Sequence, residues 1–266
     1  SGSSGARTSR SPTWSAIAAN SAAGAEDIVI LATRDGVTQS YLLSPPPAGK
    51  AQAVAILFAG AAGKVELERE AARTLLDRGN YLVRSRRLFA GHGVAAAVMD
   101  APSDQPRGMD DDFRLGDRHQ TDMETVAADL KKRFPGVPVF LVGTSRGTVS
   151  AAALGRRFGK TVDGVVLTSA VFLAGRQRGL SGFDFSSISA PLLFVHHVDD
   201  GCAATPYYAA KRLADRYPLV SVSGGSPAQS GPCEAMSAHG FLGREADTVD
   251  AIAKWMLKQP YPREIN

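Results

Sequence analysis

Short apolar runs alternate with longer amphipathic stretches along most of this chain. The runs span residues 53–58, 94–99, 137–142, 164–167, 192–195 and, more weakly, 219–222. Strands that are apolar throughout are buried on both faces, and their alternation with helices indicates a parallel sheet that is covered on each side. The helices are predicted from their apolar periodicity at residues 66–78, 117–134, 146–158, 205–216 and 245–258.

Two further strand-like stretches, 27–33 and 38–44, precede this pattern, and Asp35-Gly36 supplies turn chemistry between them. Three prolines at positions 45–47 then end strand pairing, because proline has no N–H to donate. We therefore expect an α/β fold in which an antiparallel hairpin leads into a mostly parallel sheet of about eight strands, with helices on both faces.

The chain has 266 residues, and an α/β fold of this length usually forms one domain, predicted here at 25–266. Residues 1–24 lack periodicity and are expected to form a flexible arm. They begin with Ser1-Gly2-Ser3-Ser4-Gly5, which resembles an expression-tag remnant standing in place of a natural leader. The net charge is +4, but basic and acidic side chains are interspersed, so no nucleic-acid partner is expected. No apolar run is long enough for a membrane helix, and we expect a monomer.

The two cysteines lie in loop-like sequence, in Asp200-Gly201-Cys202 and Ser230-Gly231-Pro232-Cys233. One interpretation is two unrelated buried thiols, since free cysteine is among the most buried residue types. A disulfide is the favoured interpretation, because a core thiol would be unusual in such loops. A disulfide implies an oxidising compartment, so a secreted or periplasmic location is predicted.

The pentapeptide Gly143-Thr144-Ser145-Arg146-Gly147 directly follows one predicted strand and directly precedes a helix. A Gly-x-Ser-x-Gly pattern is weak evidence alone, but strand, sharp turn and helix are the context in which it exposes a serine hydroxyl. Glycine two positions on either side removes the collisions that such a turn would create. Ser145 is therefore the predicted nucleophile; the competing interpretation is a glycine-rich turn that only packs closely.

With this motif in this context, residues 26–259 resemble the α/β-hydrolase superfamily, and most of all its small cap-less esterase and dienelactone-hydrolase-like branches. The resemblance implies a serine, an acid and a histidine in that chain order. Cap domains of the superfamily usually follow the strand at 164–167. Only about two dozen residues separate that strand from the next one, so no cap and an open site are expected.

His239 is the predicted general base, because it is the only histidine downstream of a plausible acid and the family places its base there. His92 is expected to be a solvated loop residue. His119 is expected either at the surface or at the mouth of the site. His196 and His197 end an apolar strand, where a hydrogen-bonded structural role is favoured.

The family's acid commonly falls four residues after a strand-end histidine, in a His-Gly-x-x-Asp pattern, and counting from His196 gives Asp200. Asp199 stays open as the other choice, because His197 stands where the family often has glycine. The acid's task is to fix the imidazole tautomer and stabilise the imidazolium.

Two backbone N–H groups are expected to meet the oxyanion of the reaction. One belongs to Arg146, and by position in the family the other belongs to Ala61, with Ala62 in reserve. The family's His-Gly-x pattern reads Ala59-Gly60-Ala61 here, so its histidine is missing. The competing interpretation is an ordinary glycine-rich loop.

The connection at 100–118 carries many charges, which favours a solvated loop, although its place after a strand also allows it to border the pocket. No metal or organic cofactor is expected. The predicted activity is hydrolysis of small-molecule or polymeric carboxylic esters through an acyl-enzyme on Ser145. Other serine-hydrolase activities (peptidase, thioesterase or lactonase) remain open, and so, at lower weight, does a non-catalytic binding protein of the same fold.

Overall fold

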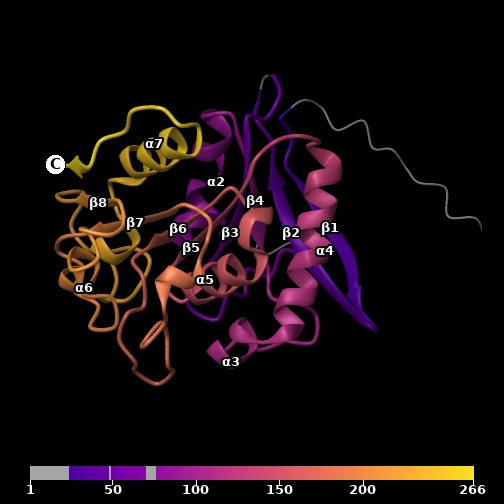
Figure 1. Ribbon diagram of the computed structural model, residues 1–266, viewed down its shortest axis with the longest axis horizontal. Coiled ribbons are helices and arrows are strands. Elements are labelled where there is room, and N and C mark those ends of the chain that lie inside the picture. Colours follow the sequence, from indigo (N-terminus) through magenta and orange to yellow (C-terminus); the bar gives the residue numbers. More distant parts are fainter. Residues whose placement is uncertain (1–23, 48, 70–75) are drawn as a thin grey trace, which may run out of the picture.

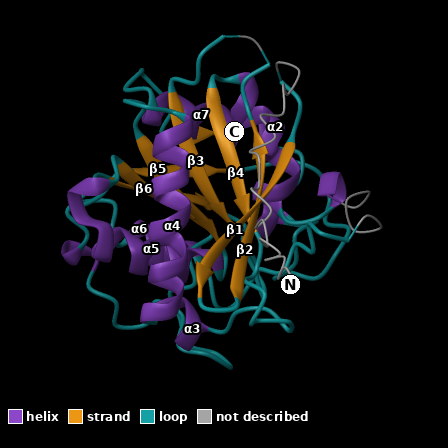
Figure 2. Ribbon diagram, turned by 90° about the vertical axis from the view of Figure 1, so that its right-hand side faces the viewer, coloured by secondary structure: helices purple, strands orange, loops and turns teal. Residues whose placement is uncertain are grey.

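In the computed structural model, which describes residues 24–47, 49–69 and 76–266, nine strands form a single sheet in the order β1-β2-β4-β3-β5-β6-β7-β8-β9 (Figures 1 and 2). Their bounds are β1 Asp27–Arg34, β2 Val37–Ser44, β3 Ala53–Phe58, β4 Val94–Met99, β5 Val139–Thr144, β6 Gly164–Thr168, β7 Leu192–His197, β8 Leu219–Val222 and β9 Glu264–Ile265. Apart from Gly24, the predicted N-terminal arm lies outside the described residues.

Strand directions confirm the predicted hairpin and the mostly parallel sheet. β1 pairs antiparallel with β2, and β2 pairs antiparallel with β4, whereas every other pair is parallel. Gly36 turns the hairpin at a φ of 66°, a backbone conformation that glycine adopts without strain. The short strand β9 was not predicted, because two residues are too few to produce a hydrophobic pattern.

Helices cover both faces of this sheet, as predicted. Figure 1 shows α2 and α7 together on one side of the sheet and α3, α4 and α5 on the other. Alternate residues of β3 point to opposite faces, so Val54 and Ile56 pack with α4 and α5, while Ala55 and Leu57 pack with α2 and α7. The helices are α2 Tyr81–Gly91, α3 Asp111–Leu115, α4 Asp117–Arg133, α5 Gly147–Phe158, α6 Tyr207–Lys211 and α7 Glu245–Met256.

The helix predicted at 66–78 is wrong in the part that can be compared. Residues 66–69 are not helical, 70–75 lie outside the described residues, and Leu76–Arg78 forms a single 3₁₀ turn. The first α-helix that the structure describes after β3 is α2, which was not predicted because three arginines interrupt its apolar pattern. Arg86 is nevertheless buried, paired with Glu26 and Asp77. The helix predicted at 205–216 shortens to α6, whereas α4, α5 and α7 agree with their predictions to within two residues at each end.

The segment between β6 and β7 forms no cap over the carboxyl ends of the strands, where the site is expected. Residues 169–191, between β6 and β7, contain one 3₁₀ turn at Phe185–Ser187 and nothing that could form a cap, as predicted. Within the described ranges, no helix is long and apolar enough to cross a membrane. The loops after β3, β5, β7 and β8 all leave the same edge of the sheet, and they carry the candidate residues.

Candidate active site

Ser145 occupies a sharp turn between β5 and α5. Its φ is 51°, a left-handed conformation that is costly for a residue with a side chain. The flanking glycines are required sterically: a Cβ at Gly143 would lie 2.4 Å from the Gly147 carbonyl oxygen, and one at Gly147 would lie 2.0 Å from that of Phe58. Gly60 also approaches closely, since a Cβ there would lie 3.0 Å from the Ser145 Cβ. The turn therefore has the geometry that the pentapeptide predicts.

His239 and Asp200 lie side by side, although they come from loops after different strands. The His239 Nδ1 atom is 3.0 Å from Asp200 Oδ2 and 3.2 Å from Asp200 Oδ1. Because a carboxylate only accepts hydrogen bonds, Nδ1 carries the proton and Nε2 keeps its lone pair. This Nε2 is buried and has no hydrogen-bond partner among the residues that the structure describes. It therefore has the chemistry of an available base.

Asp200 is held in place by groups besides His239. The Cys202 N–H donates to Oδ1 at 3.0 Å, and the Thr205 hydroxyl donates to Oδ2 at 2.8 Å. Burial on its own would raise the pKa of this carboxyl, but the hydrogen bonds from His239 and from the Cys202 backbone lower it below the usual value. Asp199 is exposed, so the geometry brings Asp200, and not its neighbour, to the histidine.

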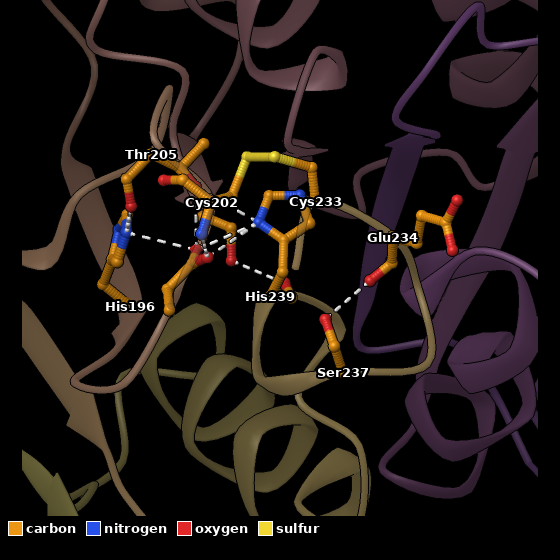
Figure 3. The surroundings of a disulfide bond; sticks show 9 residues. His196, Cys202, Thr205, Cys233, Glu234, Ser237 and His239 are labelled. Carbon is orange, nitrogen blue, oxygen red and sulfur yellow. Dashed lines mark hydrogen bonds and ion pairs between the residues drawn. A yellow bond between two sulfur atoms is a disulfide. The ribbon is translucent and has the colours of Figure 1, made fainter. Parts of the chain in front are cut away.

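The loops that carry Asp200 and His239 are tied together covalently. Cys202 and Cys233 form a disulfide, as predicted, and Figure 3 shows the His239 ring next to it. The hydroxyl of Ser169, which follows β6, donates to the His239 carbonyl oxygen at 2.8 Å. Sequence reasoning missed Ser169 and Thr205, because a single hydroxyl in a loop carries no pattern that distinguishes it from its neighbours.

Two histidines beside this pair have structural partners. His196 Nε2 donates to the Thr205 carbonyl oxygen at 2.7 Å and lies 3.6 Å from Asp200 Oδ2. Burial lowers the pKa of His196. His197 Nε2 lies 2.9 Å from the Gly224 carbonyl oxygen. Both are buried, in agreement with the hydrogen-bonded role that was favoured for them.

His119 lies neither at the surface nor at the mouth of the site, so both expectations for it were wrong. It is buried between the rings of Phe58 and Phe113, and neither of its ring nitrogens has a partner within the described part of the chain. Burial lowers its pKa to about 3, so the ring is neutral at physiological pH. His92 ends α2 with its side chain 37% exposed.

The loop after β3 forms a tight turn in which the Gly63 N–H donates to the Gly60 carbonyl oxygen at 2.9 Å. Ala61 adopts a φ of 50° at the tip of this turn. Its backbone N–H and that of Arg146 make no hydrogen bond to any described residue. These are the two N–H groups that the resemblance nominates for an oxyanion hole.

The charged connection at 100–118 is solvated only in part, since Asp111 and Arg114 are buried whereas most of its other charged side chains are exposed, and among the described residues it does not border the pocket. It contains α3, whose Asp111 is buried and accepts from the Arg146 side chain at 2.6 and 2.7 Å. Asp111 also accepts from the Gly179 N–H at 2.7 Å. One turn along α3, Arg114 is buried and reaches the loop after β3. The burial of these two side chains could not be predicted, since a run of charges usually marks a solvated surface.

Ser145 and His239 line one cavity of about 460 Å³, together with Gly60, Ala61 and Tyr81. Most of its wall is apolar. Among the described residues, the charged ones that line it are Lys64 and Glu66, which pair at 3.1 Å, and the exposed Glu234. No cluster of three or more potential metal ligands occurs within the described ranges.

The sheet order and the strained serine turn at the end of β5 define the class of α/β hydrolases. A family model described as "Serine aminopeptidase, S33" matches residues 49–207, and the chain belongs to this family. A search of curated proteins finds no significant match.

Several solved structures share the fold. Est1E from Butyrivibrio proteoclasticus is 16% identical with a TM-score of 0.59, and the match covers 87% of this chain and 98% of that one. XC6422 from Xanthomonas campestris, described as an α/β serine hydrolase without lid, is 14% identical (TM-score 0.59, 88% and 94% covered). A cold-adapted esterase from an Arctic intertidal metagenomic library is 17% identical (TM-score 0.54, 86% and 93% covered). At these identities the likeness establishes the fold alone.

Proposed function

We propose that this protein is a serine esterase in which Ser145, His239 and Asp200 act as a catalytic triad. One observation carries the proposal: Ser145, on its strained turn, and His239, whose Nε2 has no partner among the described residues, line the same cavity, while Asp200 holds Nδ1. Nucleophile, base and orienting acid are the parts that acyl transfer needs.

The reaction proceeds in two halves. The Ser145 hydroxyl oxygen attacks the ester carbonyl carbon while its proton passes to His239 Nε2. The tetrahedral intermediate then breaks its bond to the alcohol oxygen, which takes the proton from His239 Nε2 and leaves as the alcohol. Water then gives a proton to the same nitrogen and attacks the acyl-enzyme, releasing the carboxylic acid and restoring Ser145. Asp200 stabilises the imidazolium in both halves. The backbone N–H groups of Ala61 and Arg146 bind the oxyanion.

The cavity favours esters with a bulky, uncharged acyl group. Its volume of about 460 Å³ lies within the range of sites that hold small organic molecules. Its apolar wall would stabilise an aromatic or branched acyl group by burial. The similar Est1E has been solved with ferulic acid, an aromatic acid, bound, which supports testing aromatic esters first.

A second candidate is an aminopeptidase, in keeping with the description of the family. Glu234 lines the cavity and forms no ion pair with a described residue, so its carboxylate could bind a substrate ammonium group. Matched p-nitrophenyl esters and p-nitroanilides with and without a free α-amino group separate the two candidates. An aminopeptidase would cleave the amino-bearing anilides and lose that preference in Glu234→Gln.

The disulfide supports a location outside the reducing cytoplasm, and we propose that the protein works in a secreted or periplasmic setting. The activity itself is tested with aryl esters of increasing acyl size on wild type and Ser145→Ala. The variant is expected to lose activity by roughly 10⁴-fold or more, and a fluorophosphonate probe should label wild type at Ser145 only. A folded wild-type protein that the probe does not label would overturn the enzyme proposal and leave a binding protein.

A further inference from the structure

Arg114 on α3 lies directly behind the loop that carries Ala61. It is 1% exposed, and one guanidinium nitrogen donates to the Ala61 carbonyl oxygen at 3.1 Å while another donates to the Ser150 hydroxyl at 2.8 Å. The loop rests on the guanidinium so closely that a Cβ at Gly63 would lie 2.7 Å from it. The contact is therefore built into the turn.

This contact fixes the peptide groups on which the proposed oxyanion hole depends. The peptide before Ala61 is held by the Gly63 N–H, which donates to the Gly60 carbonyl oxygen, and the peptide after it is held by Arg114. Ala61 is kept at a φ of 50°, a strained value from which it would relax if either peptide could rotate. Carbonyl and N–H point in opposite directions across a trans peptide, so Arg114 also polarises the N–H of Ala62, the reserve donor.

The same short helix reaches the other side of the hole. The Asp111 carboxylate pairs with the side chain of Arg146, whose backbone N–H is the second proposed donor, and its other bond goes to the Gly179 N–H. One turn of helix thus contacts the residues that supply both donors.

Burying Arg114 is costly for the fold. No carboxylate lies within 4 Å of its guanidinium among the described residues, and its Nε has no partner there. Burial lowers the pKa of Arg114 to about 10, so the side chain stays charged at neutral pH. A buried charge without a contacting counter-ion destabilises a protein. A negative charge that forms in front of the loop during the reaction would compensate it.

We propose that Arg114 is a positioning residue for the oxyanion hole: it locks the strained Ala61 turn and places a buried positive charge behind the forming oxyanion. The inference rests on the proposed serine hydrolase function. Asp111 positions the other donor by holding Arg146. Both act through neighbouring residues, and neither lines the cavity.

The test compares Arg114→Met with Arg86→Met. Arg86 is equally buried but pairs with two carboxylates and lies away from the cavity, so its variant measures what losing a buried arginine does to folding. Arg114→Met is expected to lower kcat by roughly 10- to 100-fold with KM changed less than about threefold, because one oxyanion donor is misplaced. Arg86→Met should melt at a lower temperature and keep kcat.

A pair of inhibitors with the same acyl chain separates positioning from general damage. A trifluoromethyl ketone forms a tetrahedral oxyanion on Ser145, whereas the matching N-methyl amide binds without forming one. In Arg114→Met, affinity for the ketone should fall by the same factor as kcat/KM, and affinity for the amide should stay constant. Arg114→Lys, which keeps the charge and one donor, should recover part of the loss.

If Arg114→Met does not fold, Ser150→Ala replaces it in the test, because this variant removes the hydrogen bond on one side of the guanidinium. Its affinity for the ketone should fall by a smaller factor, and its affinity for the amide should again stay constant. Wild-type kcat and ketone affinity in Arg114→Met would overturn the proposal, and so would an equal loss of ketone and amide binding. Full activity in Ser145→Ala would instead overturn the proposed function.

Discussion

The two sides of Ser145 are stabilised by different means. The acid–base side, residues 198–206 and 223–241, is closed by the Cys202–Cys233 disulfide and by hydrogen bonds among short polar side chains. The oxyanion side, residues 59–63 and 108–114, is held by long charged side chains buried beneath it. A disulfide is broken by reductant, whereas a buried charge depends on its protonation and its surroundings. The two sides of the reaction centre should therefore respond to different conditions.

The largest effect should come from the acid–base side, with Asp200→Asn. An amide at this position favours the wrong imidazole tautomer, so kcat should fall by roughly 10⁴-fold with the fold intact. Asp199→Asn is the matched control, because the neighbouring side chain is exposed. Steady-state kinetics on one aryl ester decides the matter, and a greater loss in the Asp199 variant would assign the acid to that residue.

The junction between the two sides is tested by Gly147→Ala. The added Cβ would sit 2.0 Å from the Phe58 carbonyl oxygen, which immediately precedes the oxyanion side, so β3 and α5 must separate. We expect a loss of about 4 kcal/mol in the free energy of unfolding, measured by urea denaturation. Gly175→Ala, where no atom lies within 4 Å of the added Cβ, should change it by less than about 0.5 kcal/mol. Similar losses in both would argue against the close approach.

Removing the disulfide should weaken the acid–base side next. The bridge spans 31 residues, for which chain entropy predicts about 3–4 kcal/mol of stabilisation. In a titration with reductant, activity should fall before near-ultraviolet circular dichroism reports unfolding, because the bridge steadies Asp200 and His239. The Cys202→Ala/Cys233→Ala variant should show the same lowered activity with no response to reductant. Activity and stability that survive reduction unchanged would contradict this role.

The smallest effect should be an acid sensitivity of the fold through His119, which lies in α4 and packs against Phe113 of the oxyanion side. Its folded pKa is about 3 and its ordinary value 6.5, so between these values the unfolded chain binds a proton that the folded chain does not. Stability therefore decreases as pH falls below 6.5, by about 2 kcal/mol between pH 7 and pH 5. His119→Met should lose this part of the pH dependence in urea titrations, whereas His92→Gln should keep it. Identical pH dependence in wild type and His119→Met would refute the assignment.

The two sides also differ in how far they could be predicted. Ser145 follows a strand in a Gly-x-Ser-x-Gly motif, and the chain order that the resemblance implies points to His239 and to Asp200, with Asp199 left open. In the structure Asp200, and not the exposed Asp199, lies beside His239.

Two of the features that were missed, α2 and the buried part of the connection at 100–118, share one physical cause, the burial of arginine. Arg86 interrupts the apolar pattern of α2, so that helix was missed, and Arg114 lies in a charged connection that was expected to be solvated. Long charged side chains are almost always exposed, and only the carboxylates and carbonyls supplied by distant segments make their burial possible. Those partners are not visible in a local pattern.

The disulfide also bears on how the protein withstands proteolysis. The exposed, glycine- and serine-containing stretch from Gly224 to Gln229 lies between the two bridged cysteines and is the kind of segment that proteases cut. A single cut there would leave two pieces, one with Ser145 and Asp200 and the other with His239. The bridge would keep them covalently joined. A nicked molecule would therefore travel as one species on a non-reducing gel and separate only after reduction.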